Sequence, residues 1–99
     1  MTSFAERFRA DRRLVLLRLL SEQHGYRANS SNLHAALYAL GVTASRDDVR
    51  TDLAWLAEQG LLRTESPVDG LDVATLTARG HDVVLGLAVV PGVSRPSPR

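Results

Sequence analysis

The spacing of apolar residues predicts helices over the first sixty residues and short strands afterwards. The first helix is expected from Phe4 to about Gln23, because Ser3 and Glu6 have the spacing of a capping box. Within it, Leu14–Leu20 is apolar around nearly the whole helix circumference. One core face does not absorb that much apolar surface, so we expect something else to cover the second side of this helix.

A second, shorter helix is predicted after Gly25, which breaks the first one. The segment Asn29–Ser31 offers several N-cap residues before it. Its apolar positions follow the i, i+3, i+4, i+7 pattern of one helix face: Leu33, Ala36, Leu37 and Leu40. Gly41 suits the left-handed position that ends a helix, so a tight turn is expected to follow.

The third helix is predicted from the spacing of Ser45 and Asp48, a second capping box, and it ends at Gly60. Its apolar side carries Val49, Leu53, Leu56 and Ala57. Its outward side carries Arg46, Asp47, Arg50, Thr51, Ala54 and Glu58. The second and third helices therefore form a helix-turn-helix.

Two strands, at 61–65 and 71–76, are predicted to form a β-hairpin around the loop Ser66–Gly70, which contains Pro and Asp-Gly. A fourth helix is expected from Ala78 to about Leu87, with Thr77 as its N-cap. Residues 1–90 are thus expected to form one domain. Residues 91–99 carry three prolines and little apolar surface, and we expect them to be a flexible tail.

The composition describes one small globular domain with a core. The 99 residues include twelve arginines and eleven acids, and 44% are hydrophobic. A disulfide framework and a Cys-based metal site are excluded because there is no cysteine. The longest apolar stretches are too short to span a bilayer, and the N-terminus lacks the pattern of a secretory signal. These features favour a cytoplasmic protein, whereas a net charge of +1 decides nothing about its partners.

Three segments carry a resemblance to known families. Residues 49–62, from Val49 to Leu62, resemble the recognition helix and first wing strand of bacterial winged-helix regulators of the arsenic-repressor type. Leu76–Gly80 resembles the junction that follows the wing in several such families. Over nearly its full length, including 4–13 and Pro91–Val93, the chain resembles a small winged-helix protein of Mu-like phages and prophages.

This resemblance implies an α+β fold with a mainly helical core, a winged helix-turn-helix with three helices, a hairpin wing and a C-terminal helix. It also implies a DNA-binding transcriptional regulator, often dimeric, whose third helix, about 46–59, enters the major groove of double-stranded DNA. The expected DNA contacts at the start of this helix are Ser45, Arg46, Arg50 and Thr51, and Arg63 supports the wing.

The local charge opposes this interpretation. Residues 45–60 contain two arginines against four acids, and residues 61–76 contain one arginine against three acids, so each segment has a net charge of −2. A surface that grips phosphates usually carries more cations. Positive charge gathers instead in residues 1–27, where phosphate contacts from Arg12 and Arg13 and an ordinary solvated helix surface are equally good interpretations.

A second hypothesis is a winged-helix module for protein interaction or assembly, without sequence-specific DNA contact. The acidic third helix and wing favour a basic protein partner. In either case a homodimer is expected, because the apolar stretches 14–20 and 83–90 would bury surface together across a two-fold axis. The residues expected at this interface are Leu14, Leu17, Val84 and Leu87. The alternative is that both stretches are buried within a single chain.

No cofactor, metal site or catalytic site is predicted. His24, His34 and His81 lack ligand spacing, and no nucleophile or phosphate-loop motif is present. Trp55 lies between the buried and exposed sides of the third helix, so we expect it to anchor the wing or the first helix.

Overall fold

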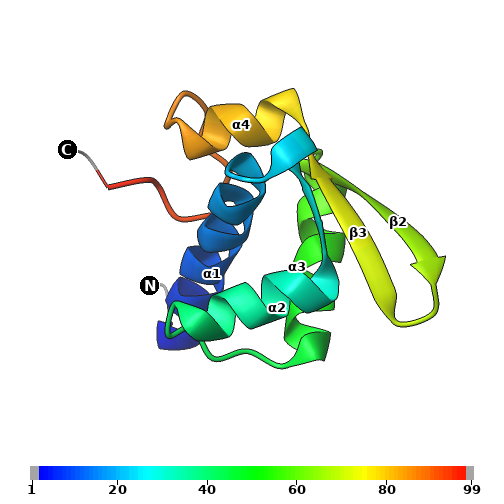
Figure 1. The fold of residues 1–99 in the computed structure, drawn as a ribbon. Coiled ribbons are helices and arrows are strands. Elements are labelled where there is room, and N and C mark those ends of the chain that lie inside the picture. Colours follow the sequence, from blue (N-terminus) through cyan, green and yellow to red (C-terminus); the bar gives the residue numbers. More distant parts are fainter. Residues whose placement is uncertain (1–2, 98–99) are drawn as a thin grey trace.

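Four helices and a three-stranded antiparallel sheet make up the fold in the computed structural model, which describes residues 3–97 (Figure 1). The helices are α1 (Phe4–Ser21), α2 (Ser30–Ala39), α3 (Arg46–Glu58) and α4 (Ala78–Val84). The strands are β1 (Arg27–Asn29), β2 (Leu62–Val68) and β3 (Leu71–Leu76), in the order β1-β3-β2, and one 3-10 turn spans His24–Tyr26. This is the predicted winged helix-turn-helix.

The capping residues read from the sequence begin their helices as expected. The Ser3 hydroxyl accepts from the backbone N–H of Glu6, and the Thr77 hydroxyl accepts from that of Gly80. At α3 the capping box is complete in both directions between Ser45 and Asp48. Gly41 has the predicted left-handed backbone, with φ of 79°, in the turn between α2 and α3.

Several boundaries differ from the prediction. Helix α1 ends at Ser21 rather than Gln23, and α4 ends at Val84 rather than Leu87 because Gly86 turns the chain with φ of 78°. Strand β2 runs on to Val68, past the predicted end at Glu65. Strand β1 was not predicted, because three residues are too few for a period to show; it pairs with β3, with Ala28 opposite Ala74.

The core lies where α1, α2 and α3 meet the sheet and α4. Its fully buried side chains include Leu16, Leu17, Leu20, Leu37, Leu53, Leu56, Leu61 and Leu62. Leu14 and Leu17, predicted at a dimer interface, belong to this core, so that part of the interface prediction is wrong. The apolar stretch of α1 is largely buried within the single chain because α2, α4, β1 and β3 pack around it.

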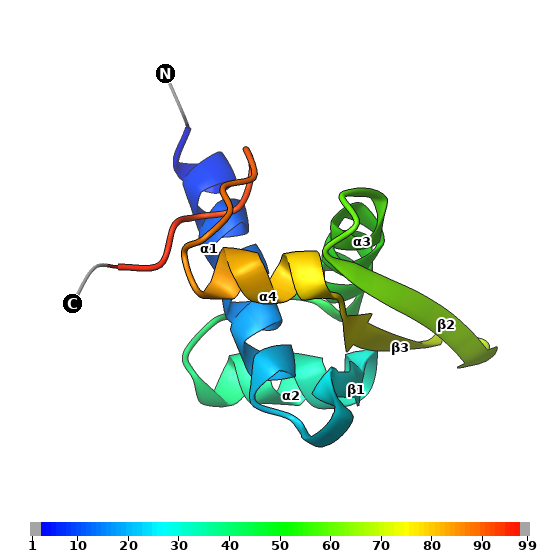
Figure 2. The same ribbon diagram turned by 90° about the horizontal axis from the view of Figure 1, so that it is seen from above.

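The segment after α4 runs back along α1 (Figure 2), which corrects the prediction of a flexible tail beginning at residue 91. Val90 and Val93 are buried in the core. The Ser94 N–H donates to Ala10 O across 3.2 Å, and Arg13 donates to Gly92 O across 3.1 Å. The domain therefore continues to at least residue 94.

Within the described residues, no helix is long and apolar enough to cross a bilayer.

Candidate nucleic-acid interface

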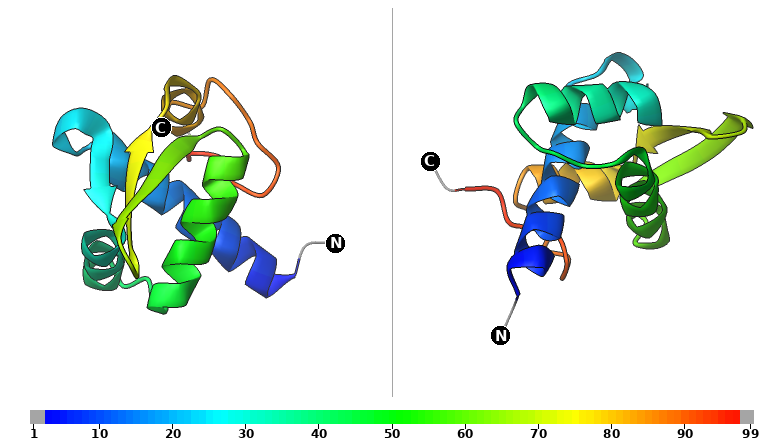
Figure 3. Two further views of the ribbon diagram at one scale, coloured as in Figure 1. Left: turned by 90° about the vertical axis from the view of Figure 1, so that its right-hand side faces the viewer. Right: turned by 90° about the horizontal axis from the view of Figure 1, so that it is seen from below.

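Helix α3 lies at the molecular surface beside the β2–β3 hairpin, with no other element over its outer side (Figure 3). Arg46 and Thr51 are exposed there, as predicted. Asp47, Ala54 and Glu58 share this side. Arg63 is exposed on β2, and the hairpin residues from 63 to 70 are all exposed.

Ser45 is occupied by the helix cap. Its hydroxyl accepts from the Asp48 N–H across 2.9 Å, and its own N–H donates to Asp48 Oδ2 across 3.0 Å. These two hydrogen bonds hold the pKa of the Asp48 carboxyl below its usual value. Asp48 therefore helps to fix where α3 begins. The hydroxyl of Ser45 is already used in the same cap.

Arg50 is held by the wing rather than free. Its Nε donates to Asp72 Oδ2 across 3.1 Å, and Ser66 donates to the other carboxylate oxygen across 2.7 Å. The Ser66 hydroxyl and then Arg50 lower the pKa of Asp72, and Asp72 in turn raises the pKa of Arg50. The Asp72 N–H also donates to the hydroxyl of buried Ser30 across 3.1 Å, so one acid joins α2, α3 and β3.

A shallow hollow of about 10 Å³ opens at this junction. It is lined by Ser30, Ser31, Arg46, Arg50 and Gly70, from the start of α2, the first half of α3 and the tip of the hairpin. The first N–H groups of a helix and two guanidinium groups favour an anion at such a place. The structure thus brings Arg46 and Arg50 together with serines that sequence reasoning did not connect to them.

Arg12 and Arg13, predicted as phosphate contacts, point into the protein instead. Their Nε atoms lie 2.5 Å and 3.6 Å from the carboxylate of Asp52, whose side chain is only 1% exposed. Hydrogen bonding to Asp52 raises the pKa of Arg12, whereas burial lowers that of Arg13. The two arginines serve the α1–α3 packing, so their placement in a DNA interface is wrong.

Sequence reasoning missed the burial of Asp52, although a signal was present. Asp52 follows Val49 by three residues and precedes Leu56 by four, which is the spacing of the core side of α3. Trp55, also in α3, contacts α1: the Arg13 guanidinium carbon lies 3.8 Å from the centroid of the Trp55 ring. The predicted anchoring of Trp55 on the first helix is confirmed.

Three acids therefore have structural partners, which changes the charge that α3 and the hairpin present. Asp48, Asp52 and Asp72 are used in a cap, a buried ion pair and the wing junction. Asp48 stays exposed and charged, because its partners are neutral groups of Ser45, so the exposed acids without an arginine partner are Asp47, Asp48, Glu58, Glu65 and Asp69. They still outnumber the two arginines without a carboxylate partner, Arg46 and Arg63, so this surface is mildly acidic.

Two of the three histidines contact neighbouring residues of the chain. His34 Nε2 lies 2.8 Å from Ala44 O, and the His81 ring packs edge-on against Tyr26.

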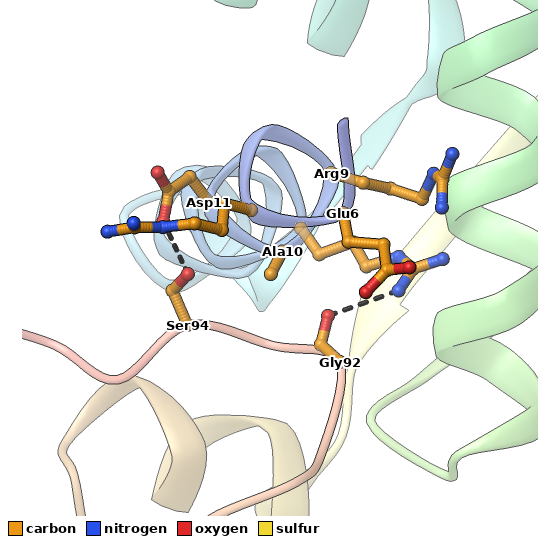
Figure 4. A pocket seen from close by; sticks show the side chains of 8 residues that line it. Glu6, Arg9, Ala10, Asp11, Gly92 and Ser94 are labelled. Carbon is orange, nitrogen blue, oxygen red and sulfur yellow. Dashed lines mark hydrogen bonds between the residues drawn. The ribbon is translucent and has the colours of Figure 1, made fainter. Parts of the chain in front are cut away.

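A surface pocket also lies between α1 and the returning C-terminal segment (Figure 4). There the Ser94 hydroxyl donates to Asp11 and Arg13 donates to Gly92, beside Glu6, Arg7 and Arg9, so the pocket mixes both charges.

Solved structures with the same fold include three of RosR from H. salinarum. One, from crystals grown with NaBr, has a TM-score of 0.64 at 17% identity and covers 75% of this chain and 66% of RosR. Two complexes, with S1 and S4, have TM-scores of 0.61 and 0.62, at 17% and 18% identity, and cover 86% and 79% of this chain and 67% and 71% of those chains. The chain thus spans about two thirds of RosR, and the likeness is one of fold.

Sequence relatives are closer. No protein-family model matches the chain. An uncharacterized protein of Haemophilus influenzae is 52% identical over 77 residues, which cover 78% of this chain and 74% of that protein. The protein gp26 of Escherichia phage Mu is 51% identical over 89 residues, which cover 90% of this chain and 91% of gp26. With this identity over nearly the full length of both proteins, the chain belongs to the family of gp26 of phage Mu.

Proposed function

We propose that this protein is a DNA-binding transcriptional regulator of phage or prophage type, with α3 in the major groove. The observation that carries the proposal is the grouping of Arg46 and Arg50 with Ser31 and the tip of the hairpin around one shallow hollow. The major groove is wide enough to admit an exposed α-helix, and a hairpin beside that helix reaches the flanking DNA backbone.

Each side chain has a distinct part in this proposal. Arg46 is exposed at the first turn of α3, where its guanidinium reaches a guanine edge or a phosphate. Arg50 is aimed by Asp72 and presents its remaining donors beside Arg46. Thr51 lies on the same side of the helix, and Arg63 contacts the backbone from the wing.

The mildly acidic surface sets the expected strength of binding. With at most three arginines making phosphate contacts, the slope of log affinity against log salt is expected to be about −2 to −3. Specific base contacts then have to supply much of the affinity, so binding to random duplex DNA is expected to be weak and to tighten on a selected operator.

Fluorescence anisotropy with a pool of random duplexes, at low and at moderate salt, tests the proposal. Replacing Arg46→Ala or Arg50→Ala should weaken binding about tenfold or more on a selected duplex. Arg79→Ala is the matched control, since Arg79 is exposed on α4 and does not line the hollow. If the double variant Arg46→Ala/Arg50→Ala binds as well as the parent, α3 is not the reading element.

A second candidate is a winged-helix module that binds a basic protein. The five exposed acids of α3 and the hairpin favour it, because they repel a polyanion and attract a cation. Absence of any duplex binding at low salt would support this candidate over the first. The variant Asp47→Asn/Glu58→Gln distinguishes the two as well: it should strengthen binding to DNA and weaken binding to a basic protein.

A further inference from the structure

Two phenylalanines stand exposed at the start of α1. Phe4 and Phe8 stack with ring centroids 5.3 Å apart, and they are 78% and 64% exposed. Neither ring belongs to the buried core of its own chain. Exposed aromatic surface of this size costs free energy in water, and a cluster of it marks a contact with another molecule.

The same side of α1 carries a hollow near its other end. Phe8, Val15 and Leu19 follow helical spacing along one side of α1, where Val15 and Leu19 are half-buried at the edge of the core. The hollow lies between the end of α1, the end of α2 and the end of α4. Its lining combines apolar and polar side chains: Val15, Arg18, Leu19, Ser21, Glu22, Leu40 and Val84.

We propose that a second copy of this chain packs on the outer side of α1, antiparallel to it and related by a two-fold axis. A projecting aromatic pair at one end of a helix and a hollow at the other end, whose lining includes Val15, Leu19 and Leu40, are self-complementary under such an axis. Phe8 of each copy then enters the hollow of the other, with the axis crossing α1 near Leu14 and Val15.

The charges along the edge of this surface match in the same register. An axis between positions 14 and 15 puts Arg7 opposite Glu22 of the second copy, and Asp11 opposite Arg18 of the second copy. All four side chains are exposed, and Arg7 and Glu22 are fifteen positions apart, too far along one helix to pair with each other. In a parallel arrangement like charges would meet instead. This charge complementarity selects a second copy over an unrelated partner.

The interface retains part of the sequence prediction. Val84 lines the hollow, as predicted for an interface residue. Leu14 and Leu17 are buried in the core, and Phe8 and Val15 take their place in the proposed interface. The hairpin extends away from α1 (Figure 2), and the exposed side of α3 is not the side that packs on α1, so both remain free in the dimer. The inference does not depend on DNA binding, and its test does not use DNA.

Sedimentation equilibrium of the full chain tests the interface. We expect the parent protein to be a dimer at micromolar concentration and Phe8→Glu to weaken the dimer about 100-fold. Val68→Glu is the control, because Val68 is 58% exposed at the hairpin and outside this surface. Far-UV circular dichroism checks that each variant is folded. A monomeric parent, or a Phe8→Glu variant that stays dimeric, overturns the proposal.

A charge exchange tests the antiparallel register separately. Arg7→Glu places like charges opposite Glu22 of the second copy and should weaken the dimer about tenfold. Arg7→Glu/Glu22→Arg restores the pairing with reversed signs and should return the dimer to near its original affinity. If the double variant is no better than the single one, the two copies do not pack in this register.

Discussion

The Nε atom of Arg12 in α1 donates to Oδ2 of Asp52 in α3 across 2.5 Å, and this buried pair joins the first helix to the outward-facing third helix. Arg13 approaches the other oxygen of Asp52 and also lies over the ring of Trp55. The orientation of α3 thus depends on charges that no longer face solvent.

Asp52→Asn is expected to lower the free energy of unfolding by about 3 kcal/mol. Removing one partner of a buried ion pair leaves the other charge uncompensated, and here two arginines lose their acid. Urea denaturation measures the loss. Asp47→Asn, on the exposed side of the same helix, should change stability by less than about 0.5 kcal/mol. Equal effects of the two substitutions would contradict a structural role for the Asp52 pair.

Gly92→Ala should destabilise the protein more than Gly86→Ala does. Both glycines have a positive φ, of 96° and 78°, so both variants carry the cost of a left-handed backbone. A Cβ at Gly92 would also lie 2.8 Å from the Trp55 ring, whereas at Gly86 nothing is within 4 Å. The extra loss is expected to be about 1–3 kcal/mol, with a change in Trp55 fluorescence. Equal losses would mean that residues 91–94 do not pack on α1 and α3.

Ser30→Ala should loosen the junction between α2 and the hairpin. The Ser30 hydroxyl is the acceptor for the Asp72 N–H, and its removal leaves that donor without a partner. A loss of about 1 kcal/mol is expected, together with faster hydrogen exchange of the Asp72 amide. Ser31→Ala, at the neighbouring position, should leave that amide protected. Unchanged exchange in Ser30→Ala would show that the hydroxyl does not hold the hairpin.

Acid is expected to destabilise the protein through Asp48 and Asp72. The hydrogen bonds of both carboxylates lower their pKa in the folded state, so their contribution is present at neutral pH and lost as pH falls through the folded-state values. The free energy of unfolding should be flat between about pH 5 and 7 and fall below about pH 4. Asp48→Asn/Asp72→Asn should show a shallower fall. Parallel curves for parent and variant would place the acid sensitivity elsewhere.

The sequence by itself determined the helices, the hairpin and the winged-helix order, because those depend on local spacing. The N-cap at Ser3, the capping box at Ser45, the glycine turn at Gly41 and the period of the leucines in α2 and α3 act within a few residues of one another. The exposed start of α3, with Arg46 and Thr51, follows from the same periodicity. These features were readable without knowing what packs against what.

The tertiary structure decided which charges are available. Arg12 is paired with Asp52, which is 40 positions away in the sequence, and Arg50 is paired with Asp72, which is 22 positions away. Local spacing gives no sign of either pair. The same holds for Leu14 and Leu17, which the sequence marks only as apolar and which the structure buries in the core. It holds also for Val93, which is buried where the chain returns to α1. Helical spacing identifies a side of a helix, but only the packed chain shows what that side meets.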